Sequence, residues 1–374
     1  MNDFYNRFDK HDFSMECNEL RQLLNASSES SDSSLIVNES DVHHLLRSVN
    51  PSKAAGPDGM SPRLLKSCAS QLSFIFTVIF NMSLKTCSIP SLWKKSYIIP
   101  VRKKPVISCM NDLRPVALTA VPMKLLERLF LNNFKKLVSS FLDPLQFAYQ
   151  KGRSCKDAIL SLLDKLYCHL EGAKRGNSVR LLFFDFSSAF NTIQPHTSVR
   201  KLIEMSLPSN YSLWILDYLT NRSQYVKLST SDVHSDLVIS NTGTPQGTVL
   251  APFLFTVYTS DCRSSVDECP LVKFADGTAT AGLISKDDDS AFISQVHSFV
   301  QYCEDNYLEL NVTKTKEMVI DFRKNSVILE PLIIKDCVVE RVSVYKYLGV
   351  MLNNELPWGD HVDQLIKKLN SRLY

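Results

Sequence analysis

The run Val179-Arg-Leu-Leu-Phe-Phe-Asp185 is the stretch of sequence that decides the fold. Its short length, apolar character and polar end are typical of a buried strand rather than a helix. A second apolar run, Leu271–Ala275, leads to Asp276 and Gly277, which together form a two-residue hairpin signal. Strand ends and tight turns can bring distant residues together at one sheet edge. Such an edge can hold two carboxylates, one from each run, but the pattern by itself does not establish that these two meet.

The rest of the chain alternates helical and extended patterns. The apolar spacing predicts helices over Ser40–Val49, Pro62–Cys87, Met123–Phe141, Cys155–Glu171, Pro195–Leu219, Thr248–Asp261, Phe292–Leu308 and His361–Tyr374. Further strands are predicted over Ser96–Pro100, Tyr225–Ser229 paired with Leu237–Ser240, Glu317–Phe322 and Val342–Met351. This order of elements predicts an α+β fold, in which helices cover one face of a sheet.

The N-terminal residues 1–39 have a different composition. They are polar and include the serine-rich run Asn25–Ser34, which offers few apolar side chains for a core. We therefore expect residues 1–39 to form a disordered linker.

Overall composition excludes several classes of protein. The chain of 374 residues is 44% hydrophobic, which is ordinary for a globular protein. Its net charge is only +3, so the overall charge does not identify it as a nucleic-acid-binding protein. A cleft could still concentrate positive charge. Its 10 cysteines include no C-x-x-C pair, which indicates reduced thiols in an intracellular protein. The apolar stretch Leu72–Leu84 is too short for the roughly 20 residues of a membrane span.

Seven short motifs occur in a fixed order along residues 40–374. They are Lys53–Gly59 (KAAGPDG), Asn111–Leu118 (NDLRPVAL), Phe183–Asn191 (FFDFSSAFN), Asn241–Phe253 (NTGTPQGTVLAPF), Phe274–Gly277 (FADG), Leu308–Lys316 (LELNVTKTK) and Tyr347–Val350 (YLGV). Together they resemble the fingers and palm motifs of reverse transcriptases from non-LTR (LINE-type) retrotransposons. One such motif is weak evidence, but seven in order make the resemblance specific.

The resemblance implies a right-hand polymerase fold. Residues 40–178 would form the fingers and an N-terminal extension, and residues 179–352 the palm, a ferredoxin-like sheet with helices on one face. Residues 353–374 would begin a thumb that is largely missing. The absence of an endonuclease and of a full thumb would make this chain a truncated copy.

The resemblance also implies a metal site. Asp185 and Asp276 would hold two Mg²⁺ ions, with Mn²⁺ as an alternative, and the backbone carbonyl of Phe186 would be an auxiliary ligand. Lys314 would protonate the pyrophosphate leaving group, and Lys316 is a rival for this role. Without the motifs, either aspartate would more simply be a solvated residue at a strand end or turn.

A second group of residues would bind the nucleotide. Arg114 would face the triphosphate, because its guanidinium fork matches phosphate oxygens. Phe190 would lie under the sugar and exclude a 2′-hydroxyl, and Gln246 and Gly247 would line the nucleotide and template pocket. Tyr347–Val350 would help to hold the primer end. Each of these residues has an ordinary structural explanation as a core or surface side chain.

One position departs from the family pattern, because Gly277 stands where a second adjacent aspartate is usual. We therefore expect an RNA-directed DNA polymerase with severely impaired activity, whose partners are an RNA template, a DNA primer and deoxynucleoside triphosphates. The alternatives are a non-catalytic nucleic-acid-binding remnant, a maturase-like RNA chaperone, or a chain too short to fold stably. The sequence does not decide between nucleus and cytoplasm, nor does it give the oligomeric state.

Overall fold

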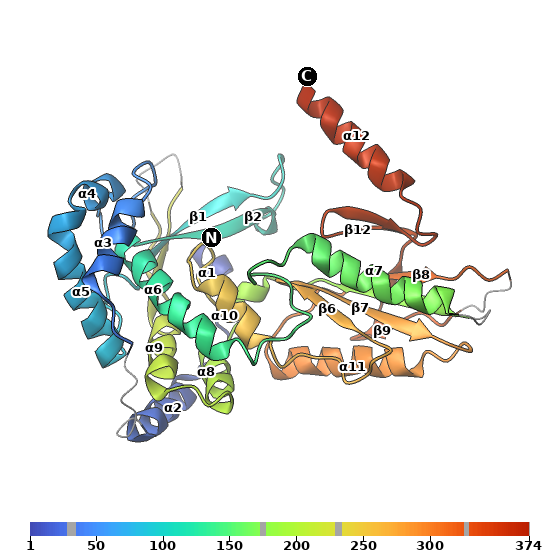
Figure 1. The fold of residues 1–374 in the computed structure, drawn as a ribbon, viewed down its shortest axis with the longest axis horizontal. Helices are drawn as coiled ribbons and strands as arrows, with labels where there is room; N and C mark the ends of the chain where they lie inside the picture. The colour runs from blue at the N-terminus through green and yellow to red at the C-terminus, as the bar shows by residue number, and fades with distance from the viewer. Residues whose placement is uncertain (28–34, 173–176, 229–233, 325–328, 374) are drawn as a thin grey trace. The chain divides into compact units, whose positions relative to one another are not determined.

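The computed structural model describes residues 1–27, 35–172, 177–228, 234–324 and 329–373. The chain divides into two compact units, each assembled from two separate stretches (Figure 1). Unit 1 combines Met1–Phe141 with Phe190–Tyr258, and unit 2 combines Leu142–Ala189 with Thr259–Tyr374. The contiguous boundaries expected at 178 and 352 therefore do not coincide with these units.

Unit 2 is built on a five-stranded sheet in the order β11-β8-β3-β7-β6. Its strands are β3 (Ser178–Phe184), β6 (Leu271–Phe274), β7 (Gly277–Ile284), β8 (Lys316–Ile320) and β11 (Glu340–Arg341). Every residue of the central strand β3 is buried, and β3 pairs in antiparallel fashion with both β7 and β8. The strand predicted from the apolar run before Asp185 is therefore confirmed.

Two helices cover opposite faces of this sheet. Phe183 shares a core cluster with the leucines of α7 (Cys155–Glu171), whereas the next residue, Phe184, packs on Phe299 of α11 (Ser290–Asp305) with ring centroids 4.1 Å apart. Successive strand residues point to opposite faces, so α7 and α11 lie on different sides, as Figure 1 also shows. The expectation of helices on one face is therefore wrong, because β3 is apolar on both faces and each face needs a cover.

The C-terminal part of unit 2 differs in detail from the prediction. The single strand expected over 342–351 is a hairpin of β12 (Val344–Tyr347) and β13 (Val350–Asn353). Its turn residues Leu348 and Gly349 both have positive φ, 45° and 91°. The remaining elements are β9 (Ile333–Ile334), β10 (Cys337–Val338) and α12 (Gly359–Leu373), a helix with no buried residue.

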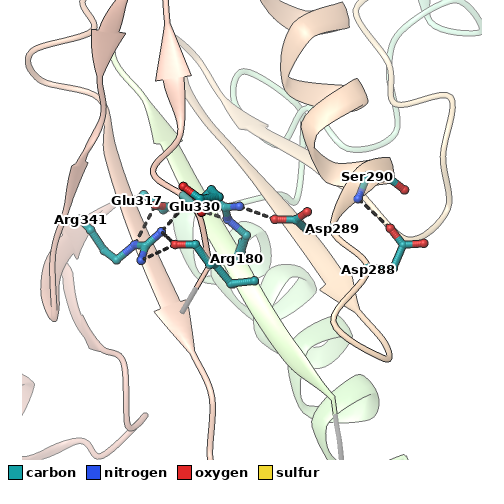
Figure 2. A network of polar contacts seen from close by, with 8 residues as sticks. Arg180, Asp288, Asp289, Ser290, Glu317, Glu330 and Arg341 are labelled. Carbon is teal, nitrogen blue, oxygen red and sulfur yellow. Dashed lines mark hydrogen bonds and ion pairs between the residues drawn. The ribbon is translucent and has the colours of Figure 1, made fainter. Parts of the chain in front are cut away.

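A buried ionic network ties the sheet of unit 2 to α11 (Figure 2). Arg180 on β3 donates to the Glu317 Oε1 at 2.6 Å and to the Asp289 carboxylate at 2.5 Å. Arg341 donates to the other oxygen of Glu317 at 2.9 Å, and the Glu330 carbonyl accepts from Arg180 at 3.1 Å. Glu317 is fully buried and thus lies between two guanidinium groups. The network places charge in the core only where each charged group has a partner.

We predict that Glu317→Ala lowers the free energy of unfolding by about 3–5 kcal/mol, because it leaves the buried Arg180 without its fully buried partner. The matched control is Glu340→Ala, which removes an exposed ion pair with Lys316 and should cost less than about 1 kcal/mol. Urea unfolding of the three proteins measures both values. Equal losses in the two variants would contradict the structural role of the network.

Unit 1 contains a four-stranded sheet in the order β2-β1-β4-β5. Its strands are β1 (Ser96–Arg102), β2 (Leu113–Thr119), β4 (Arg222–Val226) and β5 (Val238–Ser240). β4 pairs with β5 as predicted, but β4 begins three residues before the predicted strand, and its paired residues are 222–224. Its helices are α3 (Glu39–Ser48), α4 (Pro62–Ser67), α5 (Ala69–Thr86), α6 (Val121–Val138), α8 (Pro195–Glu204), α9 (Ser209–Leu219) and α10 (Ala251–Tyr258). Among the described residues, no helix has the length and apolar character needed to cross a bilayer.

The N-terminal segment belongs to the fold of unit 1. Residues 1–27 contain α1 (Asn2–Tyr5) and α2 (Ser14–Ser27). Tyr5 and Phe8 are buried, and Leu20 packs in a cluster with residues of α8 and α9. The expected disordered linker over 1–39 is therefore wrong for residues 1–27, because a few large apolar side chains anchor an otherwise polar segment. Residues 28–34 of the serine-rich run lie outside the described residues.

Candidate active site

The strand ends bring Asp185 and Asp276 to one pocket. Phe184, the last residue of β3, pairs with Thr278, so Asp185 emerges beside the start of β7. Asp276 lies in the turn that precedes β7. Both aspartates line a pocket of about 180 Å³ in unit 2, together with Phe186 and Gly277. The structure thus places together the two carboxylates that the motif resemblance selected.

The turn before β7 is shifted by one residue from the expected hairpin. Phe274 pairs with Gly277, so the two turn residues are Ala275 and Asp276 rather than Asp276 and Gly277. Ala275 has φ +56°, an uncommon value for a residue with a side chain. Gly277 has no such backbone requirement, since its φ lies outside the left-handed region.

The opposite wall of the pocket comes from the β12–β13 hairpin. Tyr345, Tyr347 and Leu348 all line the pocket, and the ring of Tyr345 stacks on Phe183 with centroids 4.4 Å apart. Partial burial, and then the negative charge of Asp185, raise the pKa of the Tyr345 phenol. Tyr345 and Asp185 line the same pocket, so the carboxylate lies within electrostatic reach of the phenol. The YLGV motif therefore contributes directly to the acidic pocket.

A loop before β8 holds the backbone after β3. The Asn311 N–H donates to the Asp185 carbonyl at 2.8 Å, and the Asp185 N–H donates to the Thr315 hydroxyl at 3.3 Å. The Phe186 carbonyl accepts from the Ser188 N–H at 3.1 Å. Because a carbonyl oxygen has two lone pairs, this bond leaves acceptor capacity on Phe186. The LELNVTKTK motif thus fixes the strand end that carries Asp185.

The structure distinguishes Lys314 from Lys316, the two candidates for protonating the pyrophosphate leaving group. The Nζ of Lys314 lies 3.9 Å from the Asp185 Oδ2, and its side chain is 69% exposed. The Nζ of Lys316 instead lies 2.7 Å from the Glu340 carboxylate and also donates to the Thr313 carbonyl. Only Lys314 of this pair is beside the acidic pocket.

The donor set of the pocket suits a cation that also takes ligands from its substrate. Within the described ranges, no group of three or more His, Cys, Asp or Glu side chains could hold a metal by itself. Mg²⁺ is commonly held by one or two carboxylates plus substrate phosphates and water. Asp185 and Asp276 fit this pattern, because two carboxylates supply only part of the ligands that such a cation needs.

The loop that carries Gln246 and Gly247 lies in unit 1. The Ala117 N–H of β2 donates to the Gln246 carbonyl at 2.5 Å, and the Gln246 side chain donates to the Asn191 amide oxygen at 3.3 Å. Gly247 has φ +106°, and a Cβ there would be 3.1 Å from the Ala117 carbonyl oxygen. Glycine is therefore required at this close approach. Arg114 is exposed on the same strand, three residues before Ala117.

Phe190 is half-buried in unit 1. Its ring packs on Phe255 with centroids 5.0 Å apart, and its carbonyl accepts from the Thr244 N–H at 2.7 Å. Phe190 is thus linked to the loop that carries Gln246. The expected site residues therefore form two groups: Arg114, Phe190, Gln246 and Gly247 in unit 1, and Asp185, Phe186, Asp276 and Lys314 in unit 2.

Sequence analysis missed Glu127, a fully buried carboxylate on α6. One of its oxygens accepts the N–H groups of Val249 at 2.6 Å and Leu250 at 2.9 Å, two and three residues after Gly247. Burial raises the pKa of Glu127 to about 7, despite these hydrogen bonds. Its only signal in the sequence is a single charged residue among the apolar side chains of a helix, which is too weak to reveal its partners.

We predict a pH-dependent stability that depends on Glu127. The unfolded chain loses this proton near the ordinary value of 4.5, whereas the folded chain keeps it until about pH 7. Stability should therefore fall as pH rises through this window, by about 3 kcal/mol in total. Urea unfolding of the wild type and Glu127→Gln at pH 5 and pH 8 tests this, because glutamine does not titrate. A stability difference between the two proteins that is constant with pH would refute it.

The chain matches the model of a known protein family. The model of the family described as reverse transcriptase (RNA-dependent DNA polymerase) matches residues 101–352. The chain therefore belongs to the reverse transcriptase family.

Two similar relatives come from mobile elements of Drosophila melanogaster. The chain is 23% identical to a probable RNA-directed DNA polymerase from transposon BS, over 89% of this chain and 37% of that protein. It is also 23% identical to the RNA-directed DNA polymerase from mobile element jockey, over 100% of this chain and 41% of that protein. The chain thus spans about two fifths of the length of these relatives.

Proposed function

We propose that the chain is the catalytic core of an RNA-directed DNA polymerase of a non-LTR retrotransposon. The observation that carries the proposal is the meeting of Asp185 and Asp276 in one pocket at the ends of neighbouring strands. The relatives are themselves named as polymerases of mobile elements. The sheet of unit 2 corresponds, in this proposal, to the polymerase palm.

Asp185 and Asp276, with the Phe186 carbonyl, would hold a pair of Mg²⁺ ions. When bound, such ions stabilise the attacking and leaving oxygens of a nucleotidyl transfer. Lys314 projects beside Asp185 and remains largely exposed, so its ammonium group can donate a proton to the departing pyrophosphate. Lys316 is less suited to this role, because it is paired with Glu340.

The residues of unit 1 would bind the incoming deoxynucleotide. Exposed Arg114 is available to the triphosphate oxygens, and Gly247 allows the backbone to approach a ligand closely. Gln246 would contact the nucleotide and template, and the Phe190 ring would discriminate against a ribose 2′-hydroxyl. An RNA template and a DNA primer complete the proposed set of partners.

Gly277 would impair this activity. Two aspartates bring one negative charge fewer to the metal pair than three would, and the substrate phosphates compensate for only part of this loss. Removing even an indirect partner of a bound metal costs about 10–100-fold in affinity or activity. A missing direct ligand should cost at least as much.

A non-catalytic remnant that binds nucleic acid is the competing function, and primer extension separates the two. Wild-type protein is incubated with a labelled DNA primer on an RNA template, deoxynucleoside triphosphates and Mg²⁺. The polymerase proposal expects weak extension that requires Mg²⁺ and disappears in Asp185→Ala. Binding of the primer–template without extension, in both the wild type and Gly277→Asp, would favour the remnant.

A further inference from the structure

Gln146 is a fully buried residue of unit 2 whose main chain extends the sheet edge beside β6. It forms a parallel bridge with Lys273, which donates its N–H to the Leu145 carbonyl at 2.9 Å. The N–H of Phe147 donates back to the Lys273 carbonyl at 2.8 Å. The register of Gln146 against β6 is therefore fixed on both sides.

A buried ion pair anchors the same segment. The Nζ of Lys273 lies 2.8 Å from a carboxylate oxygen of Asp143, and both side chains are almost fully buried. The other oxygen of Asp143 accepts the Leu145 N–H at 2.9 Å. Since the pair joins β6 to the segment before Gln146, the segment cannot slide along the strand without separating two buried charges.

The Gln146 side chain contacts the turn that carries Asp276. Its Oε1 accepts the Ala275 N–H at 3.1 Å, and its Nε2 is 3.4 Å from the Ala275 carbonyl oxygen. The same Oε1 accepts the Ala148 N–H at 3.1 Å, which fixes the side-chain rotamer. Both backbone polar groups of Ala275 are thus satisfied by one buried amide.

Ala275 needs such support. Its φ of +56° lies in the left-handed region, which costs about 1–2 kcal/mol for a residue with a Cβ and persists only where the surroundings enforce it. Asp276 follows directly, so the backbone angles of Ala275 determine where the Asp276 carboxylate points. A change at Ala275 would displace the carboxylate from the pocket that it shares with Asp185.

Tyr149, three residues after Gln146, is close enough to the Asp276 carboxylate for its phenol to be affected by the negative charge. Partial burial, and then the charge of Asp276, raise the pKa of the Tyr149 phenol. The segment therefore approaches the Asp276 turn at Gln146, through hydrogen bonds, and at Tyr149, through the charge of Asp276.

We propose that Gln146 is a positioning residue for Asp276. Gln146 holds the Ala275 backbone in its left-handed conformation, and this conformation sets the direction of the Asp276 carboxylate. The inference rests on the proposed polymerase function. Gln146 itself would contact neither substrate nor metal. Its effect should consequently be on the affinity of the site for the divalent cation, not on binding of the primer–template.

The test compares two matched buried glutamines. Gln146→Met removes the hydrogen bonds to Ala275, and Gln295→Met removes a similarly buried amide of α11 that accepts from Ser264. Both are made in the Gly277→Asp background, and Mn²⁺ binding is measured by the EPR signal of the free ion, alongside the Mg²⁺ concentration for half-maximal primer extension. We expect Gln146→Met to weaken cation binding by about tenfold, with an unchanged KM for primer–template, and Gln295→Met to leave both values unchanged.

A rescue variant separates positioning from general destabilisation. Glycine adopts positive φ without the Cβ penalty, so Ala275→Gly should restore part of the cation affinity lost in Gln146→Met. Equal cation affinities in Gln146→Met and its parent, or equal losses in the two Met variants, would overturn the proposal. Failure of the polymerase function would look different, because the Gly277→Asp parent itself would then extend no primer.

Discussion

Replacing Gly277 by Asp should raise Mg²⁺-dependent extension of a DNA primer on an RNA template by well over tenfold. The new carboxylate would stand next to Asp276 at the start of β7, in the wall of the pocket that both aspartates line. It would supply the direct cation ligand whose absence should cost at least as much as losing an indirect one, about 10–100-fold.

The backbone at Gly277 can accept this side chain. A Cβ there would lie 3.2 Å from the Phe274 carbonyl oxygen and 3.5 Å from the Leu348 Cδ2. The first contact requires a small shift and the second is ordinary packing. The substitution should therefore change the chemistry of the pocket without unfolding the hairpin.

Gly277→Asn is the matched control for charge. Asparagine has nearly the same shape as aspartate but brings no negative charge to the cations. Extension should rise only in Gly277→Asp if the missing ligand is the cause of impairment. A similar rise in both variants, or none in Gly277→Asp, would refute the proposed effect of Gly277 on the metal site.

The local pattern of apolar residues predicted much of unit 2. The helix over Cys155–Glu171 has the predicted bounds, and β3 differs from its prediction by one residue. Both are strongly patterned segments in which burial follows directly from side-chain type. The two strand-end aspartates were selected by the motifs around them, because an apolar run that ends in an aspartate is more simply a solvated strand end or turn.

Long-range polar contacts could not be predicted in this way. Glu127 and Gln146 bind backbone groups more than 100 residues away, and nothing in their neighbouring residues indicates these partners. β2 was missed as a strand because it contains Pro115, which lacks a backbone N–H donor. Proline is tolerated there because β2 lies at the edge of its sheet. The N-terminal helices were missed because composition averages hid the anchoring role of Tyr5 and Phe8.

The two-carboxylate site also makes a direct prediction about cation binding. Asp185 and Asp276 come from neighbouring strands and line one pocket, so each should contribute to the same bound cation. In the proposed site, removing either carboxylate would delete a direct ligand. Asp185→Asn and Asp276→Asn should each weaken binding by at least about tenfold. The double variant should be little weaker than either single one, because the two residues act on a shared ion.

Mn²⁺ titration followed by the EPR signal of the free ion, with primer–template and a non-hydrolysable deoxynucleotide present, tests this claim most directly. The account predicts Mn²⁺ binding that Mg²⁺ displaces and that falls steeply in each single Asn variant. Asp261→Asn, an exposed aspartate outside the pocket, should bind Mn²⁺ like the wild type. Unchanged binding in Asp185→Asn or Asp276→Asn would contradict a shared cation site.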